Sequence, residues 1–166
     1  MKPFIGLKKI WYGDVIATDL SAAPAVESMT EVKNVHQGTW GYSQDDTSIT
    51  DYVNELTGRT YYRDAESAGA KTISFSMGEY DYADMAALEG GSVISSKGWK
   101  ATDGVQVINK AVVALTKTNQ YIVFTNASII AKVDTQNKNL CLGVTATAQE
   151  NPNEGVAPEY WFDATA

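Results

Sequence analysis

The sequence predicts a mainly β fold, a sandwich or barrel of antiparallel strands that carries a single packed α-helix. Residues 71–77 alternate strictly between apolar and polar side chains. The apolar members are Ile73, Phe75 and Met77, and this period of two is typical of a half-buried strand. Residues 140–148 alternate in the same way. A helix signature directly after the first of these strands completes the prediction.

That signature indicates a helix of about two turns that begins after Asp81. Asp81 can cap the helix, and Asp84, three residues later, completes a variant of the capping box. The glycine pair at 90–91 is expected to end it. Met85 and Leu88 are apolar and are expected to pack the helix against the sheet.

Other strands are expected along most of the chain. In chain order they are predicted at residues 7–12, 31–35, 39–42, 49–53, 59–63, 104–109, 111–117, 121–125 and 127–133. Residues 59–63 and 71–77 are predicted to pair as a hairpin around 64–69. Polar turns at 118–120 and 134–139 separate the later strands. Nothing divides the chain, so all 166 residues are expected to form one domain.

Three segments are predicted to be flexible arms or loops, at residues 15–30, 43–48 and 149–166. The first is rich in Ala and Ser, and the second is a polar run without periodicity that contains Asp45 and Asp46. Loops of this length in a compact domain are usually functional or disordered.

Composition excludes some classes of protein. The net charge is −7, from 20 acidic and 13 basic residues, which argues against a protein that grips nucleic-acid phosphates. The single cysteine, Cys141, cannot form an intrachain disulfide and is expected to be a buried or half-buried strand residue. We expect no secretory signal at the N-terminus, and no apolar run approaches the roughly 18 residues of a membrane-spanning helix.

The search for catalytic groups finds little. His36 is the only histidine, which excludes a histidine metal cluster, and its place before a turn favours a structural role. Two carboxylate pairs, Asp45 with Asp46 and Asp81 with Asp84, could be considered for glycoside hydrolysis. A solvated loop and a helix cap explain them more simply. We therefore expect no enzyme, no catalytic or metal-binding residue and no cofactor.

Exposed aromatic residues leave a binding function open. Trp40, Tyr61 and Tyr62 could form a stacking platform for a carbohydrate, or they could simply pair across strands. The polar positions of the strand at 71–77 also predict a broad polar sheet face. When the edge strands of such a sheet are free to pair with another chain, a monomer tends to aggregate. In a polymer the same pairing joins the subunits.

Five runs, in order, resemble a known family. They are Thr-Trp-Gly-Tyr at 39–42, Thr-Asp-Tyr at 50–52, the run at 56–62, the run at 75–83 and Leu-Glu-Gly-Gly at 88–91. Together with the order of strands, loop, hairpin and helix, these runs resemble the major tail tube proteins of long-tailed bacteriophages. The resemblance is greatest to versions from phages and prophages of Bacteroidetes-type bacteria.

The resemblance implies a structural virion protein, made in the host cytoplasm, that forms hexameric rings stacked as the hollow phage tail. Its implied partners are further copies of itself, the tape-measure protein, and the tail terminator and tip proteins. DNA would pass through the lumen without sequence-specific binding, and no membrane insertion is implied. The implied contacts between subunits involve Asp45, Asp46, Thr47, Asp64 and Glu66. A tube protein of a contractile injection or secretion system would share this geometry and stays an alternative.

Overall fold

The structure, a computed structural model, describes residues 2–95 and 97–164. It is mainly β, with 49% strand and 6% helix, which confirms the predicted fold class. All its strand pairs are antiparallel. The strands are β1 (Lys9–Gly13), β2 (Thr30–Glu31), β3 (Gly41–Gln44), β4 (Ser48–Asn54), β5 (Arg59–Ser67), β6 (Lys71–Met77), β7 (Ser92–Ile94), β8 (Gly98–Lys100), β9 (Asn109–Leu115), β10 (Gln120–Gln136), β11 (Asn139–Ala148) and β12 (Glu159–Asp163). The helices are the short 3-10 helix η1 (Val26–Ser28) and α1 (Tyr82–Leu88).

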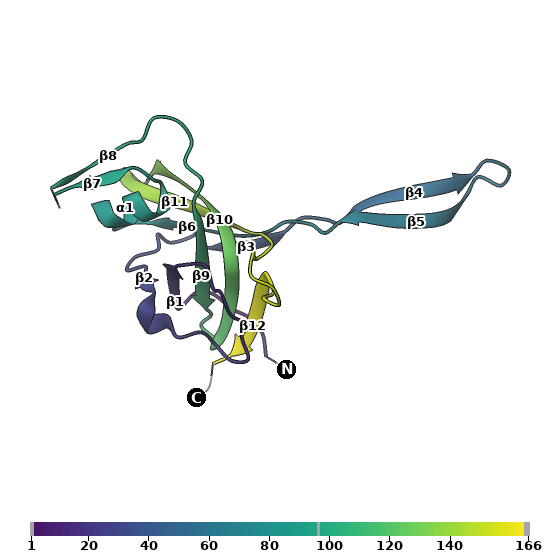
Figure 1. Cartoon of the computed structure of the whole chain (residues 1–166), viewed down its shortest axis with the longest axis horizontal. Helices are drawn as coiled ribbons and strands as arrows, with labels where there is room; N and C mark the ends of the chain where they lie inside the picture. The colour runs from purple at the N-terminus through teal and green to yellow at the C-terminus, as the bar shows by residue number, and fades with distance from the viewer. Residues whose placement is uncertain (1, 96, 165–166) are drawn as a thin grey trace.

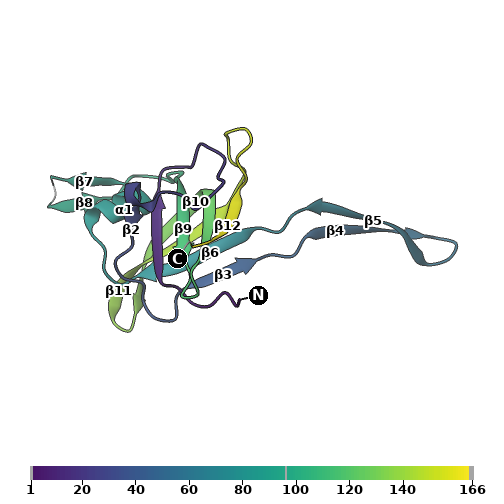
Figure 2. The same ribbon diagram turned by 90° about the horizontal axis from the view of Figure 1, so that it is seen from below.

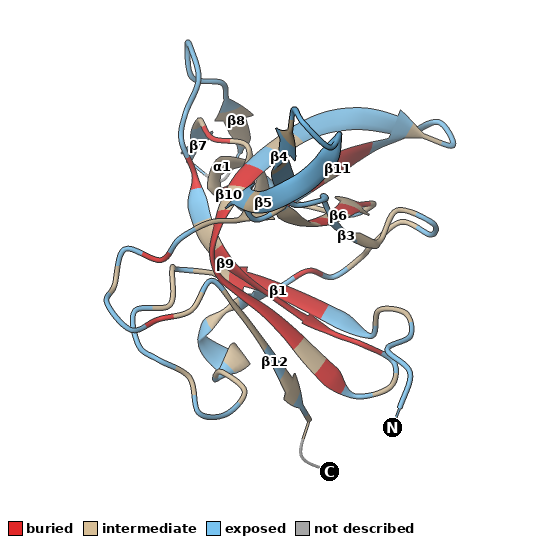
Figure 3. Cartoon of the chain, turned by 90° about the vertical axis from the view of Figure 1, so that its right-hand side faces the viewer, coloured by how far each residue is buried: buried red, intermediate tan, exposed pale blue. Residues whose placement is uncertain are grey.

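One long strand, β10, organises the main sheet, whose order is β2-β1-β9-β10-β11-β6-β3 with β12 also paired to β10. The first half of β10 pairs with β9 and β12, and its second half pairs with β11. A register shift between Phe124 and Ala127 separates the two halves. Because a bulge bends a strand, the sheet folds over into two layers, which Figure 3 shows crossing at an angle. We call the second half of β10 with β11, β6 and β3 the four-stranded layer.

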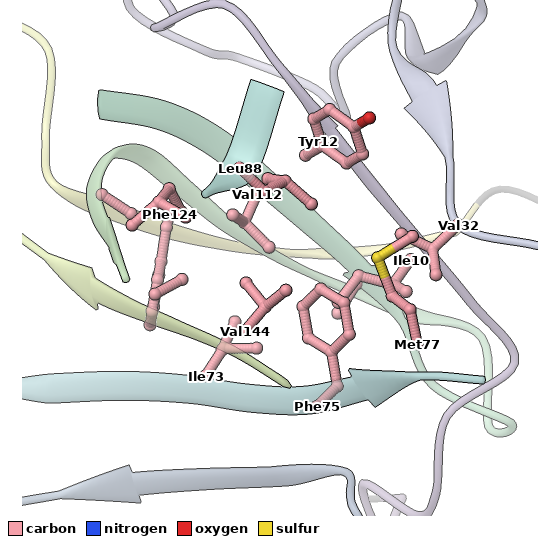
Figure 4. Packing of buried hydrophobic residues seen from close by; sticks show 14 of the residues in the cluster. Ile10, Tyr12, Val32, Ile73, Phe75, Met77, Leu88, Val112, Phe124 and Val144 are labelled. Atoms are coloured by element: carbon pink, nitrogen blue, oxygen red, sulfur yellow. The ribbon is translucent and has the colours of Figure 1, made fainter. Parts of the chain in front are cut away.

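The main hydrophobic core lies between these layers (Figure 4). As predicted, Ile73, Phe75 and Met77 of β6 point into it and are at most 3% exposed. On β11 the core residues are Leu142, Val144 and Ala146. Leu140, predicted on the same face, is 60% exposed, because it lies near the β10–β11 turn, beyond the end of the core.

The helix follows the predicted signals. Asp81 accepts a hydrogen bond from the Asp84 backbone N–H (2.9 Å), and the Asp84 carboxylate accepts one from the Asp81 N–H (3.2 Å). This reciprocal pair is the capping box, and Gly90 follows the helix at a φ of 107°. Leu88 is 1% exposed in the core, and Met85 packs partly buried against it.

Replacing Leu88 with Ala should lower the free energy of unfolding by about 2–5 kcal/mol, because a fully buried leucine leaves a cavity. Urea denaturation measures this loss. Leu56→Ala is the matched control, since Leu56 is 95% exposed and its loss should change stability by less than about 0.5 kcal/mol. Equal denaturation midpoints for the two variants would contradict the placement of the helix.

A second contact ties the helix to the sheet, because the Tyr12 hydroxyl of β1 donates to the Asp84 carboxylate at 2.5 Å. Burial, and then this hydrogen bond, raise the pKa of Tyr12 above its ordinary value of 10.0. The folded state therefore favours the neutral phenol. This contribution is fully present below about pH 10 and is lost as the pH rises further.

Tyr12→Phe should accordingly make the protein less sensitive to alkaline pH. The measurement is the free energy of unfolding of both proteins between about pH 8 and pH 11. We expect the wild type to lose more stability than the variant over this range. The same loss in both proteins would refute the role of this phenol.

The predicted hairpin between residues 59–63 and 71–77 is wrong. Strand β5 pairs with β4, whereas β6 pairs with β11 and β3. The physical reason is a tight turn between β4 and β5, in which the Gly58 N–H donates to the Asn54 carbonyl at 2.8 Å. Gly58 has a φ of 68°, which suits glycine, so the nearest strand becomes the partner of β5.

Other predicted boundaries also differ. In the expected loop at 43–48, Ser43 and Gln44 belong to β3 and Ser48 begins β4. A strand was expected at 31–35, but only Glu31 of these residues lies in one. Another was expected at 104–109, where only Asn109 lies in a strand. The two strands expected at 121–125 and 127–133 are one bulged strand, β10. These differences arise where pairing with a distant strand decides the structure.

Two of the predicted loop segments cover the outer face of the other layer, which is formed by β1, β9 and the first half of β10. Trp11, Val113, Leu115 and Val123 form a second apolar cluster there. Segment 15–30 covers it with Ile16, Leu20, Val26 and Met29, and β12, within segment 149–166, adds Tyr160 and Phe162. Both segments therefore pack against the main sheet. We call the main sheet, with the helices and loops that pack on it, the body.

Candidate functional site

The most prominent feature is a hairpin, β4–β5, that projects from the body (Figures 1 and 2). We call residues 48–67 the arm. Among the described residues its strands pair only with each other, in a sheet separate from the main one. An isolated two-stranded hairpin is marginally stable in water. The arm is therefore an element whose stability would increase by contact with a partner.

The arm carries many exposed apolar side chains. They are Ile49, Tyr52, Val53, Leu56, Tyr61 and Tyr62, with exposures between 44% and 95%. The rings of Tyr52 and Tyr62, which face each other across the strands, lie 5.8 Å apart. An exposed apolar cluster of this kind marks an interaction surface in soluble proteins. These residues follow no period of two, so only their number within residues 49–62 could have indicated the cluster in the sequence.

All five residues predicted to contact other subunits lie on the arm or at its base. Asp64 and Glu66 are on β5, and Glu66 accepts a hydrogen bond from the Thr50 hydroxyl of β4. Asp45, Asp46 and Thr47 connect β3 to the arm. Contact of these residues with another copy stays a prediction. The predicted helix residues belong to α1, a different part of the fold.

The base of the arm is tightly built. The Asp45 N–H donates to the Ala70 carbonyl at 2.9 Å, which joins the chain entering the arm to the chain leaving it. A Cβ at Gly69 would overlap the carbonyl oxygen of Asp45, so only glycine fits at this crossing. Next along the chain, Lys71 forms an ion pair with Glu159 of β12 at 3.1 Å.

The Glu159 carboxylate also accepts a hydrogen bond from the Tyr42 hydroxyl at 2.6 Å. Its side chain is only 13% exposed. Burial, followed by this hydrogen bond, raises the pKa of Tyr42. The carboxylate thus links the first β6 residue and β3 to β12, and fixes the base of the arm to the body.

The four-stranded layer has two free edges. Beyond Ile129, β10 pairs only with β11, and β3 pairs only with β6. Within residues 2–95 and 97–164, no strand lies beside the outer edge of 130–136 or of β3. These edges are the opposite sides of one layer. Their unpaired backbone groups can pair with another chain.

The outer face of this layer is mostly polar, with Ile130 as an exposed apolar side chain (68%), and contains a shallow hollow of about 200 Å³. Residues lining it include Thr39, Ser74, Ser76, Lys132, Asp134, Gly143 and Thr145. The charged members, Lys132 and Asp134, are of opposite sign, and most of the remainder are small and neutral. The polar stripe expected at Thr72, Ser74 and Ser76 lies partly exposed on β6.

A second exposed region lies at the opposite end of the molecule from the arm, around α1 and the β7–β8 hairpin (Figures 1 and 2). We call α1, β7, β8 and residues 101–108 the far end. Its exposed apolar residues include Val93 and Ile94 on β7. Val105 and Val107 in the following loop are 99% and 81% exposed.

The other candidate residues are spread over the fold. Trp40 packs partly buried against the main core, whereas Tyr61 and Tyr62 are exposed on the arm, so the three rings form no common platform. The His36 N–H donates to the Ser76 carbonyl at 2.8 Å, and its ring lies 3.4 Å from the Asn137 amide. Cys141 is buried, as predicted.

No three His, Cys, Asp or Glu side chains of the described residues lie together so that they could hold a metal. No helix among the same residues is long and apolar enough to span a membrane.

The chain matches no protein-family model and no curated protein.

Proposed function

We propose that this chain is the structural subunit of a hollow tube, a phage tail tube, in which copies join edge to edge in rings and the rings stack. The observation that carries the proposal is the four-stranded layer with its two free edges. The resemblance of the sequence to tail tube proteins supports the same assignment.

Strand direction favours a ring. The four strands alternate in direction from β10 through β11 and β6 to β3, because each pair is antiparallel. The two outer strands therefore run in opposite directions. If a second copy is rotated about an axis parallel to the strands, its β10 edge meets the β3 edge of the first copy in antiparallel pairing. Such a heterologous contact closes into a ring when the rotation divides a full turn.

The polar face suits the wall of a lumen. Around its hollow, the charged residues are one lysine and one aspartate, and the rest are neutral, mostly small side chains with the exposed Ile130 among them. Phosphate binding to proteins depends on clustered lysines and arginines. A wall of this composition would allow DNA to pass without sticking, and a tape-measure protein would occupy the lumen before ejection.

The arm supplies the contact between rings. In a ring built by rotation alone, every copy presents its arm on the same side. The exposed apolar residues of the arm would then be covered by the adjacent ring, which explains their exposure in one copy.

Electron microscopy of the purified, concentrated protein tests this function. We expect rings with a central hole and hollow tubes built from them. Analytical ultracentrifugation of the same sample should show one dominant ring species at intermediate concentration. A protein that remains monomeric up to millimolar concentration would overturn the proposal.

A further inference from the structure

One carboxylate oxygen at the far end has no partner. Oε2 of Glu89, the residue that caps the C-terminus of α1, is buried without a hydrogen-bond partner in the described part of the chain. Buried polar groups are nearly always paired, because an unpaired one costs free energy. The backbone carbonyls at the end of a helix add further negative potential. The position therefore favours a cation.

Glu89 lines a hollow that could admit such a cation. The hollow measures about 140 Å³ and lies between Gly90, Gly91, Trp99 and Gln106. Two of its walls are held by hydrogen bonds: the Trp99 ring N–H donates to the Gly90 carbonyl, and the Gly91 N–H donates to Gln106. These hydrogen bonds thus hold the shape of the hollow, which lies next to the exposed residues Val105 and Val107.

The arm carries a free cation. Arg59, the first residue of β5, is exposed and has no ion pair with any described residue, whereas Arg63 is paired with Asp51 at 2.7 Å. Leu56 and Tyr61, which flank Arg59 in the sequence, are 95% and 70% exposed. The end of the arm therefore combines one guanidinium with apolar side chains.

The charge match between the two regions is local. Residues 45–69 carry six acidic and two basic side chains, and residues 82–108 carry three acidic side chains and two lysines, so neither region is basic overall. The two regions lie at opposite ends of the long axis of the molecule (Figures 1 and 2). Copies arranged head to tail therefore bring the guanidinium of one arm toward the unpartnered carboxylate oxygen of the next copy, and the contact repeats along a stack.

We propose that the end of the arm docks on the far end of a second copy, with the Arg59 guanidinium in the hollow donating to Glu89. A planar guanidinium fits a carboxylate with two parallel hydrogen bonds. The apolar side chains of the arm cover Val105 and Val107 of the neighbour. This contact rests on the proposed function, because it is the stacking contact between rings.

Charge exchange tests the pairing. Arg59→Glu and Glu89→Lys should each raise the protein concentration needed for tube formation at least about tenfold, because each leaves a charge unpaired at the contact. The double variant should recover much of this loss. Arg59→Lys should have a smaller effect, and Lys33→Glu, an equal charge change on an exposed residue outside both regions, should have none.

Two further measurements make the outcome decisive. Glu89→Gln keeps the shape of the side chain and should also weaken stacking. If Glu89→Lys has a lower melting temperature because it folds poorly, Glu89→Gln still tests the contact. Sedimentation at intermediate concentration should show intact rings for all variants. Normal tubes from Arg59→Glu, or no recovery in a folded double variant, would overturn the docking alone. A wild-type protein that forms neither rings nor tubes would overturn the proposed function itself.

Discussion

Replacing the arm with a short turn should abolish tubes and leave a folded body. Within the part of the chain that the structure describes, the arm pairs only with itself, so its removal takes no strand from the main sheet. The two ends of the arm are already adjacent, because Asp45 and Ala70 share a backbone hydrogen bond of 2.9 Å. A Gly-Ser turn in place of residues 47–68 can therefore close the gap.

Circular dichroism and thermal melting should show a body whose melting temperature changes by only a few degrees. Ultracentrifugation should still detect rings, because both edges of the four-stranded layer remain. Electron microscopy should show no tubes at concentrations where the wild type forms them. Tubes of normal length from this variant would contradict the role of the arm in stacking.

The second large effect is expected from Gly69→Ala. A methyl group at this position overlaps the Asp45 carbonyl oxygen. The methyl is fixed to Cα and the carbonyl belongs to the backbone, so neither can move aside as the end of a flexible side chain would. We expect the crossing at the base of the arm to open and the arm to change its direction. Overpacking of this kind typically costs about 1–3 kcal/mol.

Tube formation by Gly69→Ala should require at least about tenfold more protein, since 1.4 kcal/mol corresponds to a factor of ten. Gly98→Ala is the matched control, because a Cβ at Gly98 meets no atom within 4 Å. If both variants form tubes at the wild-type concentration, the base of the arm does not control stacking.

Local signals account for the parts of the fold that the sequence predicted correctly. The alternation at Ile73, Phe75 and Met77 and the capping box of Asp81 and Asp84 each depend on neighbours a few residues away. Strand partners depend on residues far along the chain. The pairing of β5 with β4 and the continuous, bulged β10 were therefore missed, as was the short hairpin β7–β8.

The candidate site was predicted only in part. Asp45 and Asp64 were predicted in two separate loops as contacts between subunits; they lie at the base of the arm and on β5, and their contact with another copy stays a prediction. Tertiary structure decides whether a hairpin packs on the body or projects from it. The sequence around Tyr52 and Tyr62 therefore did not predict an arm. The free edges of the four-stranded layer could not be predicted from the sequence either, because an edge exists where a strand has no neighbour on one side.

The most direct test of the account is amide hydrogen exchange followed by mass spectrometry, with dilute protein compared with assembled tubes. Pairing of the two edges between copies should protect amides in residues 41–44 and 130–136 on assembly, since these backbone groups have no strand partner on one side in a single copy. Residues in the core strand β9 should be protected equally in both states. Tubes in which 41–44 and 130–136 exchange as fast as in the dilute protein would contradict the edge-to-edge ring.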